Sequence, residues 1–228
     1  MKHLILLSFS LILIVSPALS LTSKDAYVIR QGDAWTLGTV KVERTLKLAD
    51  GKFFTDGWKD KTSGRELLPA GTVADELSAV IDGQKVLGTS GGWKLMDAKE
   101  RTLAQGEIQL DIRLRSDSLE VTKSYVVYPG SSIIREWVSF KNVGTGPLRV
   151  SEPGFLNLTT EPGPPQSVDF HWMTGGENQP GSWTLKTEKL KAGKIREFDS
   201  YDPFGGTAEG NFLGDGVLAK VLVNDRQV

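Results

Sequence analysis

The residues from Phe170 to Trp183 combine side chains that suit contact with a sugar. They read Phe-His-Trp-Met-Thr-Gly-Gly-Glu-Asn-Gln-Pro-Gly-Ser-Trp, a predicted strand that continues into a glycine-rich loop. Aromatic rings pack against the flat C–H faces of sugars, and amide and carboxylate groups hydrogen-bond to hydroxyls. The alternative for both tryptophans is a place in the hydrophobic core. The candidate ligand-binding residues are Trp172, Glu177, Asn178, Gln179 and Trp183.

Acidic residues in the last third of the chain are candidate catalytic groups. Hydrolysis of a glycosidic bond uses two carboxyl groups about 5 to 10 Å apart. The sequence does not give these separations, and acidic residues beside glycines are common in solvated turns. The residues concerned are Asp169, Glu177, Asp199, Asp202 and Glu209. No catalytic residue is predicted.

The composition excludes several kinds of chemistry. The chain has no cysteine and only two histidines, so it cannot form a zinc site rich in cysteine or histidine, and thiol catalysis is excluded. It has no Gly-x-Ser-x-Gly elbow, phosphate-binding loop or dinucleotide fingerprint. Asp199, Asp202 and Asp215 do not have the spacing of a calcium loop. We predict no metal and no cofactor, and the net charge of −1 indicates no nucleic-acid partner.

The N-terminus has the layout of an export signal. Lys2 and His3 precede an apolar run that Pro17 ends, and small residues lie just before Leu21. The run is shorter than the roughly 20 apolar residues that a membrane-spanning helix needs. We therefore predict a signal peptide over residues 1–20, no membrane span, and a mature protein that is secreted or periplasmic.

The pattern of the mature chain, residues 21–228, predicts an all-β protein. In segment 107–115, Ile108, Leu110, Ile112 and Leu114 alternate with polar residues, which predicts an antiparallel strand with one solvated face. Further strand-like runs lie between turn-forming residues, whereas only residues 72–80 come close to a helical pattern. These runs are 35–48, 77–81, 92–96, 119–128, 133–141, 148–151, 168–173, 182–188 and 217–223. The pattern predicts a large antiparallel β-sandwich.

Segment 121–144 carries Tyr128-Pro129 after one predicted strand, Arg135-Glu136-Trp137 in the next, and the turn Asn142-Val143-Gly144. In these motifs it resembles the N-terminal domain of glycoside hydrolase family 36-type α-galactosidases. The likeness spans roughly residues 35–223, and similar strand-turn-strand patterns occur in galactose mutarotase-like sandwiches. The resemblance implies a β-supersandwich that packs on a following (β/α)₈ barrel, which would carry both catalytic aspartates.

The resemblance thus predicts an accessory domain of an exported α-galactosidase-like hydrolase. Its partners would be its own C-terminal catalytic barrel and, through the parent enzyme, an α-galactoside. Asn224-Asp225 favours a hairpin turn followed by only three residues, which predicts a chain cut before the barrel. The alternatives are a freestanding carbohydrate-binding or mutarotase-like module and a structural envelope or adhesion domain.

Overall fold

The computed structural model describes residues 19–160, 169–174, 184–191, 195–199 and 218–222. The chain divides into two compact units, Met1–Glu161 and Pro162–Val228, which are described separately here. The predicted signal peptide lies almost entirely outside the described residues. The described part begins at Leu19, where the first strand starts, so cleavage after Ser20 would remove two residues of that strand.

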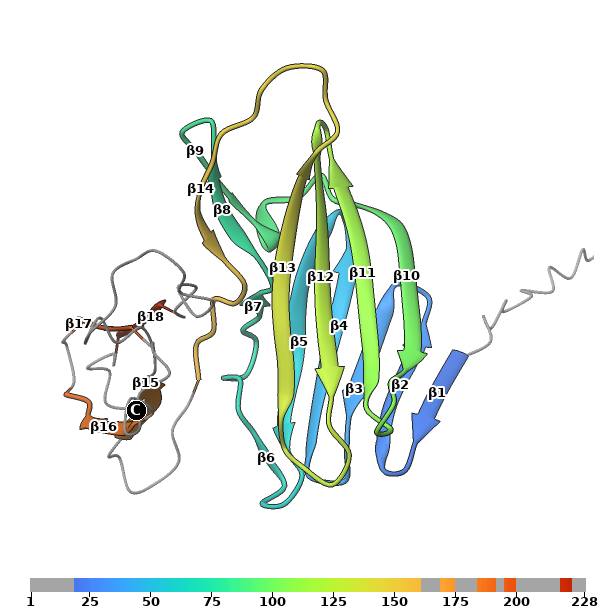
Figure 1. The fold of residues 1–228 in the computed structure, drawn as a ribbon, viewed down its shortest axis with the longest axis vertical. Coiled ribbons are helices and arrows are strands. Elements are labelled where there is room, and N and C mark those ends of the chain that lie inside the picture. Colours follow the sequence, from blue (N-terminus) through green and yellow to red (C-terminus); the bar gives the residue numbers. More distant parts are fainter. Residues whose placement is uncertain (1–18, 161–168, 175–183, 192–194, 200–217, 223–228) are drawn as a thin grey trace, which may run out of the picture. The chain divides into compact units, whose positions relative to one another are not determined.

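Two antiparallel sheets form most of the first unit (Figure 1). Sheet I contains β1 (Leu19–Ser23), β2 (Ala26–Gln31), β3 (Ala34–Gly38), β4 (Val42–Ala49), β5 (Lys52–Asp60) and β6 (Arg65–Glu66), with β7 (Ala74–Asp75) beside β5. Sheet II contains β10 (Lys94–Thr102), β11 (Ile108–Ser116), β12 (Leu119–Val127) and β13 (Ile134–Asn142). The strands of both sheets follow one another as hairpins, because short turns favour pairing of neighbours in the chain.

A smaller sheet joins distant parts of the same unit. Its order is β14 (Val150–Gly154), β8 (Ser78–Ile81) and β9 (Gln84–Leu87), and the short 3-10 turn η1 (Gly88–Ser90) follows β9. Within its described residues, the second unit contains two separate antiparallel strand pairs. In these, β15 (Asp169–Thr174) pairs with β16 (Thr184–Lys189), and β17 (Ile195–Asp199) pairs with β18 (Leu218–Leu222).

The hydrophobic core lies between sheets I and II. Ile108, Leu110, Ile112 and Leu114 are all fully buried, which confirms the alternation predicted for this strand. They pack in one cluster with Val28, Leu37, Leu46 and Phe53 from sheet I. Removal of this apolar surface from water is the main force that holds the two sheets face to face. The chain is therefore an all-β antiparallel sandwich, as predicted.

Several element boundaries differ from the predicted ones. The run 35–48 is two strands, because Thr39 closes a tight connection by donating its N–H to the carbonyl of Val42 at 2.8 Å. The helical alternative for residues 72–80 was wrong, since this segment supplies β7 and part of β8. Strands β1, β2, β5, β6, β9 and β17 were not predicted. The predicted hairpin turn at Asn224-Asp225 lies outside the described residues.

No helix in the described ranges is long and apolar enough to cross a membrane.

Candidate functional site

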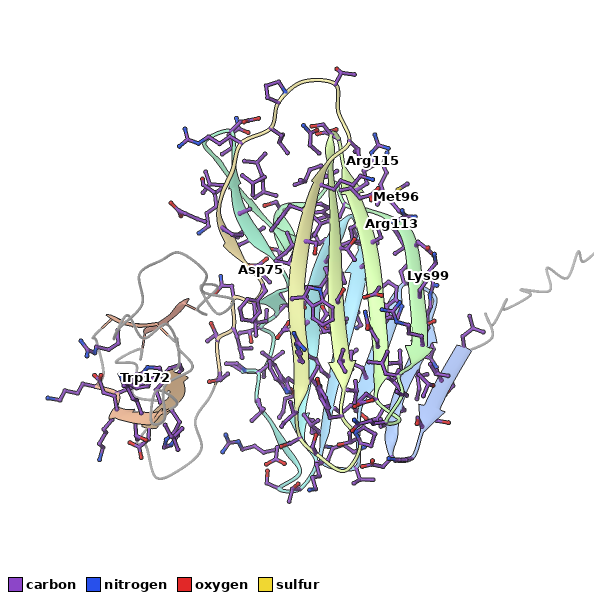
Figure 2. The ribbon with its side chains drawn as sticks, in the orientation of Figure 1. Asp75, Met96, Lys99, Arg113, Arg115 and Trp172 are labelled. Carbon is purple, nitrogen blue, oxygen red and sulfur yellow. The ribbon has the colours of Figure 1, made fainter. Side chains whose placement is uncertain are left out.

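Only one of the five predicted ligand-binding residues lies in the described part of the chain. Trp172 is half-buried in β15, opposite Lys186 of β16. Its ring centroid is 6.0 Å from that of Phe170, and the two rings are tilted by 33°. They share one face of the hairpin because alternate residues of a strand point the same way. Trp172 is labelled in Figure 2. Glu177, Asn178, Gln179 and Trp183 lie outside the described residues, so their role stays a prediction.

His171 lies on the other face of the same strand. Its Nδ1 is 2.8 Å from the hydroxyl of Thr187, the residue opposite it in β16. Asp169 shares this face, and both side chains are exposed. Within the described residues, no group of three His, Asp or Glu side chains could hold a metal ion.

The first unit contains a cluster of charged side chains that sequence reasoning missed. Arg44 of β4, Glu76 between β7 and β8, and Lys123 of β12 have fully buried side chains, and the side chain of Glu136 in β13 is only 8% exposed. We call these four residues, with Thr55 and Tyr125, the interior charge cluster. It contains two cations and two carboxylates, so its formal charge is zero.

Glu76 has contacts from both sheets. Its Oε1 is 2.5 Å from Nη2 of Arg44 and accepts a short hydrogen bond from the hydroxyl of Thr55. Its Oε2 accepts a short hydrogen bond from Tyr125 and lies 3.5 Å from Nζ of Lys123. Both carboxylate oxygens are therefore paired, as burial of a charge requires.

Glu136 connects the two cations of the cluster. Its Oε1 is 3.0 Å from Nη1 of Arg44, and its Oε2 is 2.7 Å from Nζ of Lys123. Lys123 also donates to the backbone carbonyls of Glu76, at 2.8 Å, and Phe155. The ammonium group of Lys123 thus has acceptors for its three protons. The cluster joins β4, β5, β12, β13 and the segment before β8.

A β-bulge shapes the surroundings of Arg44. Thr45 is opposite Gly57 and Leu46 is opposite Thr55, so Asp56 is an extra residue in β5. The extra residue changes which positions of β5 face inward. As a result Thr55 receives a 2.9 Å hydrogen bond from Nε of Arg44, and Trp58 places its ring 4.5 Å from the guanidinium carbon. The bulge lets both residues contact the same arginine.

The backbone around Glu76 is fixed on both sides. Asp75 pairs with Phe54 of β5 and exchanges two hydrogen bonds with Asn157, at 2.9 and 3.1 Å. The carboxylate of Asp75 also accepts from the N–H and hydroxyl of Thr89. These contacts hold the segment at residue 76 against sheet I, so the side chain of Glu76 points into the interior.

Electrostatics keep Glu76 ionised in spite of burial. Burial alone would raise its pKa, but Arg44 and Lys123 offset this effect, and hydrogen bonds from Thr55 and Tyr125 add to them, so the pKa of Glu76 is lowered. Burial and the nearby carboxylate of Glu76 raise the pKa of Tyr125 well above its ordinary value. Tyr125 is therefore a neutral hydrogen-bond donor to an ionised carboxylate.

The interior charge cluster is suited to hold the sheets in register and not to catalysis. A catalytic acid or base must reach its substrate, whereas Arg44, Glu76 and Lys123 have no solvent-exposed side-chain surface. Each of these groups already has partners within the cluster. Polar groups buried in this way specify one arrangement of a core, because any other arrangement leaves a charge unpaired.

A signal for this cluster was present in the sequence. Lys123 falls between Val121 and Tyr125 on the alternating apolar face of β12, and Glu136 shares a face with Ile134 and Val138. A single charged residue on the apolar face of a strand indicates either a bulge or a buried ion pair. The pattern could have indicated burial of these two charges, though not their partners.

Comparison of the chain with protein-family models and with curated proteins found no match.

Proposed function

We propose that the chain is the non-catalytic β-sandwich domain of an exported α-galactosidase-like glycoside hydrolase. The observation that supports this most directly is the place of the residues that carry the family resemblance. Arg135-Glu136-Trp137 lies in the middle of β13, directly beside β12. Glu136 in this motif pairs with Arg44 and Lys123, so the motif has a structural role in a sandwich domain.

The other shared motifs also have structural roles. Asn142 accepts a hydrogen bond from the N–H of Gly144 at 2.9 Å and donates to the carbonyl of Gly146 at 2.7 Å, which forms the turn after β13. Tyr128-Pro129 begins the connection from β12 to β13, where the carbonyl of Tyr128 accepts from the hydroxyl of Ser131. A domain that stabilises a separate catalytic barrel needs turns of this kind. It does not need a catalytic acid–base pair of its own.

The size and activity of the natural protein test this proposal. An antibody against the sandwich should detect, outside the cells or in the periplasm, a polypeptide much larger than the 24.9 kDa chain. That polypeptide should hydrolyse aryl α-galactosides, whereas the 228-residue chain alone should not. Detection of only a 24.9 kDa species, or hydrolysis by that chain alone, would overturn the proposal.

A freestanding carbohydrate-binding module is the second candidate. The observation in its favour is the pair of neighbouring rings, Phe170 and Trp172, on one face of the β15–β16 hairpin. Titration of the chain with melibiose or raffinose, followed by tryptophan fluorescence, measures such binding. Trp172→Ala should abolish the response, and His171→Ala, on the opposite face of the same strand, should retain it. An unchanged response in Trp172→Ala would exclude this hairpin as the sugar site.

A further inference from the structure

The outer face of sheet II carries an excess of positive charge. Strand pairing places four outward residues of each strand in four rows across the sheet, and we call this surface the outer platform. The rows are Lys94, Arg115, Glu120 and Lys141; Asp97, Arg113, Thr122 and Ser139; Lys99, Asp111, Ser124 and Trp137; and Arg101, Gln109, Val126 and Arg135. Seven of these residues are basic and three are acidic, although the whole chain has a net charge of −1.

The acidic residues of the platform leave several cations without an ionic partner. Asp97 lies 3.1 Å from Lys99 and 3.9 Å from Arg113, and Asp111 lies 3.9 Å from Arg101. Glu120 is 3.8 Å from Arg113, which is already next to Asp97. In the part of the chain that the structure describes, the remaining platform cations make no ion pair. They are Lys94, Arg115, Arg135 and Lys141.

The unpaired cations border the platform at two ends. Lys94, Arg115 and Lys141 share the first row, and Arg135 is in the last row. Figure 2 labels Arg115 of the first row, and Arg113 of β11 and Lys99 of β10, which lie between the first and last rows. Strands lie about 4.8 Å apart and same-face residues about 6.8 Å apart, so the platform covers about 14 by 20 Å. This area suits an extended ligand better than a single small ion.

The centre of the platform carries an aromatic ring and hydrogen-bonding groups. Trp137 is half-exposed, lies directly opposite Ser124, and has the guanidinium of Arg135 5.4 Å from its ring. Asp111 accepts hydrogen bonds from Gln109 at 2.8 Å and from Ser124 at 2.6 Å. Gln109 and Ser124 are themselves buried, so the groups open to a ligand in this part of the platform are the indole ring of Trp137 and the carboxylate of Asp111, which can contact sugar rings and hydroxyls.

The outer face of sheet I differs in charge. Its outward cation Lys47 lies 2.5 Å from Asp56, and Lys61, just after β5, lies 3.8 Å from Glu43. Lys52 and Lys59 of β5 are exposed and make no ion pair among the described residues. The outer platform differs in that strand pairing aligns four such cations on one sheet face.

The charge pattern also decides between classes of partner. Cores of protein interfaces are depleted in Lys, Asp and Glu, which occupy six of the sixteen platform positions, so this surface is poorly suited to docking a second domain. Duplex DNA carries a phosphate on every unit and no free hydroxyl along its backbone, so its backbone offers no hydrogen-bond donor to the three interleaved carboxylates. A chain that carries both acidic groups and free hydroxyls can pair with the cations and also donate hydrogen bonds to the carboxylates.

We propose that the outer platform binds an acidic polysaccharide, a sugar chain that bears carboxylate or sulfate groups. Lys94, Arg115, Arg135 and Lys141 pair with the acidic groups, and Trp137 packs against a sugar ring between them. This inference rests on the carbohydrate-related function proposed above and names a second class of ligand, separate from the neutral galactoside. The site would hold the protein on an acidic polymer that surrounds or contains the substrate.

Binding of polygalacturonate and of dextran sulfate to the full chain tests the inference by affinity electrophoresis and calorimetry. Affinity should fall by about tenfold or more between about 50 and about 200 mM NaCl, because binding releases counterions. The double variant Lys94→Glu, Lys141→Glu should lose about tenfold in affinity, since two attractive charges become repulsive. The matched control Lys52→Glu, Lys59→Glu changes net charge equally on sheet I and should stay within about twofold.

Comparison of the two polymers distinguishes carboxylate from sulfate as the preferred group, and neutral dextran should not bind. Equal losses in the two double variants would overturn the inference, because binding would then follow net charge alone. Binding of duplex DNA as tight as that of the acidic polysaccharides would also overturn it. These outcomes are independent of the galactoside assays with the natural protein and with Trp172→Ala, so either proposal can fail alone.

Discussion

Arg44 and Glu136 face each other across the two sheets of the sandwich, with Nη1 and Oε1 3.0 Å apart, although 92 residues separate them in the sequence. Arg44 belongs to β4 of sheet I and Glu136 to β13 of sheet II. Their contact joins the two halves of the core at a point where hydrophobic packing alone would allow the sheets to slide. The shared carboxylate of Glu76 and the ammonium of Lys123 complete the charge balance around this contact.

Removal of one charge from the interior cluster should be strongly destabilising. We expect Lys123→Met to lower the free energy of unfolding by about 3–5 kcal/mol, because Glu76 and Glu136 lose a buried partner. The same substitution at Lys141, on the outer face of sheet II, should change it by less than about 0.5 kcal/mol. Urea denaturation followed by tryptophan fluorescence gives both values. A loss below about 1 kcal/mol for Lys123→Met would show that the cluster is hydrated or not formed.

Stability should decrease in acid in a way that depends on Glu76. The folded-state pKa of Glu76 is lowered from 4.5, so below that value the unfolded state binds a proton more readily than the folded state. The stability that this group contributes is present above pH 4.5 and is lost as the pH falls through the lowered pKa. Urea midpoints measured between neutral pH and acid should therefore decrease, and Glu76→Gln should reduce this dependence. An identical acid dependence in Glu76→Gln would contradict the assignment.

Stability should also decrease at alkaline pH, because of ionisation of Tyr125. Its folded-state pKa is raised well above 10.0, so the unfolded chain releases the phenolic proton first. Its contribution is present below pH 10.0 and is lost as the pH rises above that value. Tyr125→Phe removes the ionising group and the hydrogen bond to Glu76, so it should be less stable at neutral pH and less sensitive to alkali. Denaturation midpoints measured at neutral and alkaline pH check both effects.

The tryptophans should differ sharply in their contribution to stability. Trp35 is fully buried and packs edge-on against Phe53, with 6.5 Å between the ring centroids. Trp35→Ala should cost about 3–5 kcal/mol. Trp172 is half-buried on a hairpin, so Trp172→Ala should cost less than half as much. Melting curves of the two variants compare these losses of stability. Equal losses in Trp35→Ala and Trp172→Ala would place Trp172 in a core.

The hairpin between β3 and β4 should not tolerate a side chain at Gly38. A Cβ at this position would lie far inside van der Waals contact with the carbonyl oxygen of Val42, so Gly38→Ala must move the backbone. We expect a loss of about 1–3 kcal/mol. Gly146→Ala is the matched control, because a Cβ there has no heavy atom within 4 Å. Thermal melting checks both, and a neutral Gly38→Ala would show that this connection is not rigid.

The local pattern of apolar and polar residues predicted much of the fold. The alternation in β11 determined which of its side chains enter the core, and turn-forming residues separated most of the strands of sheet II correctly. This works because the side-chain period of a strand is two whatever its partner is. Strand β5 was missed because its bulge at Asp56 breaks that period, and β1 because it overlaps the end of the predicted signal segment.

An all-β chain, the apolar faces of its central strands, and the places of Lys123 and Glu136 on those faces follow from the amino-acid pattern. The folded arrangement was needed to show that these charges meet Arg44 and Glu76 from distant segments, and that the outward residues of β10–β13 form one cationic surface. This difference arises because strand alternation is a local property of the backbone. Pairing of charges and alignment of rows depend on sheet stacking and register, which many distant contacts fix together.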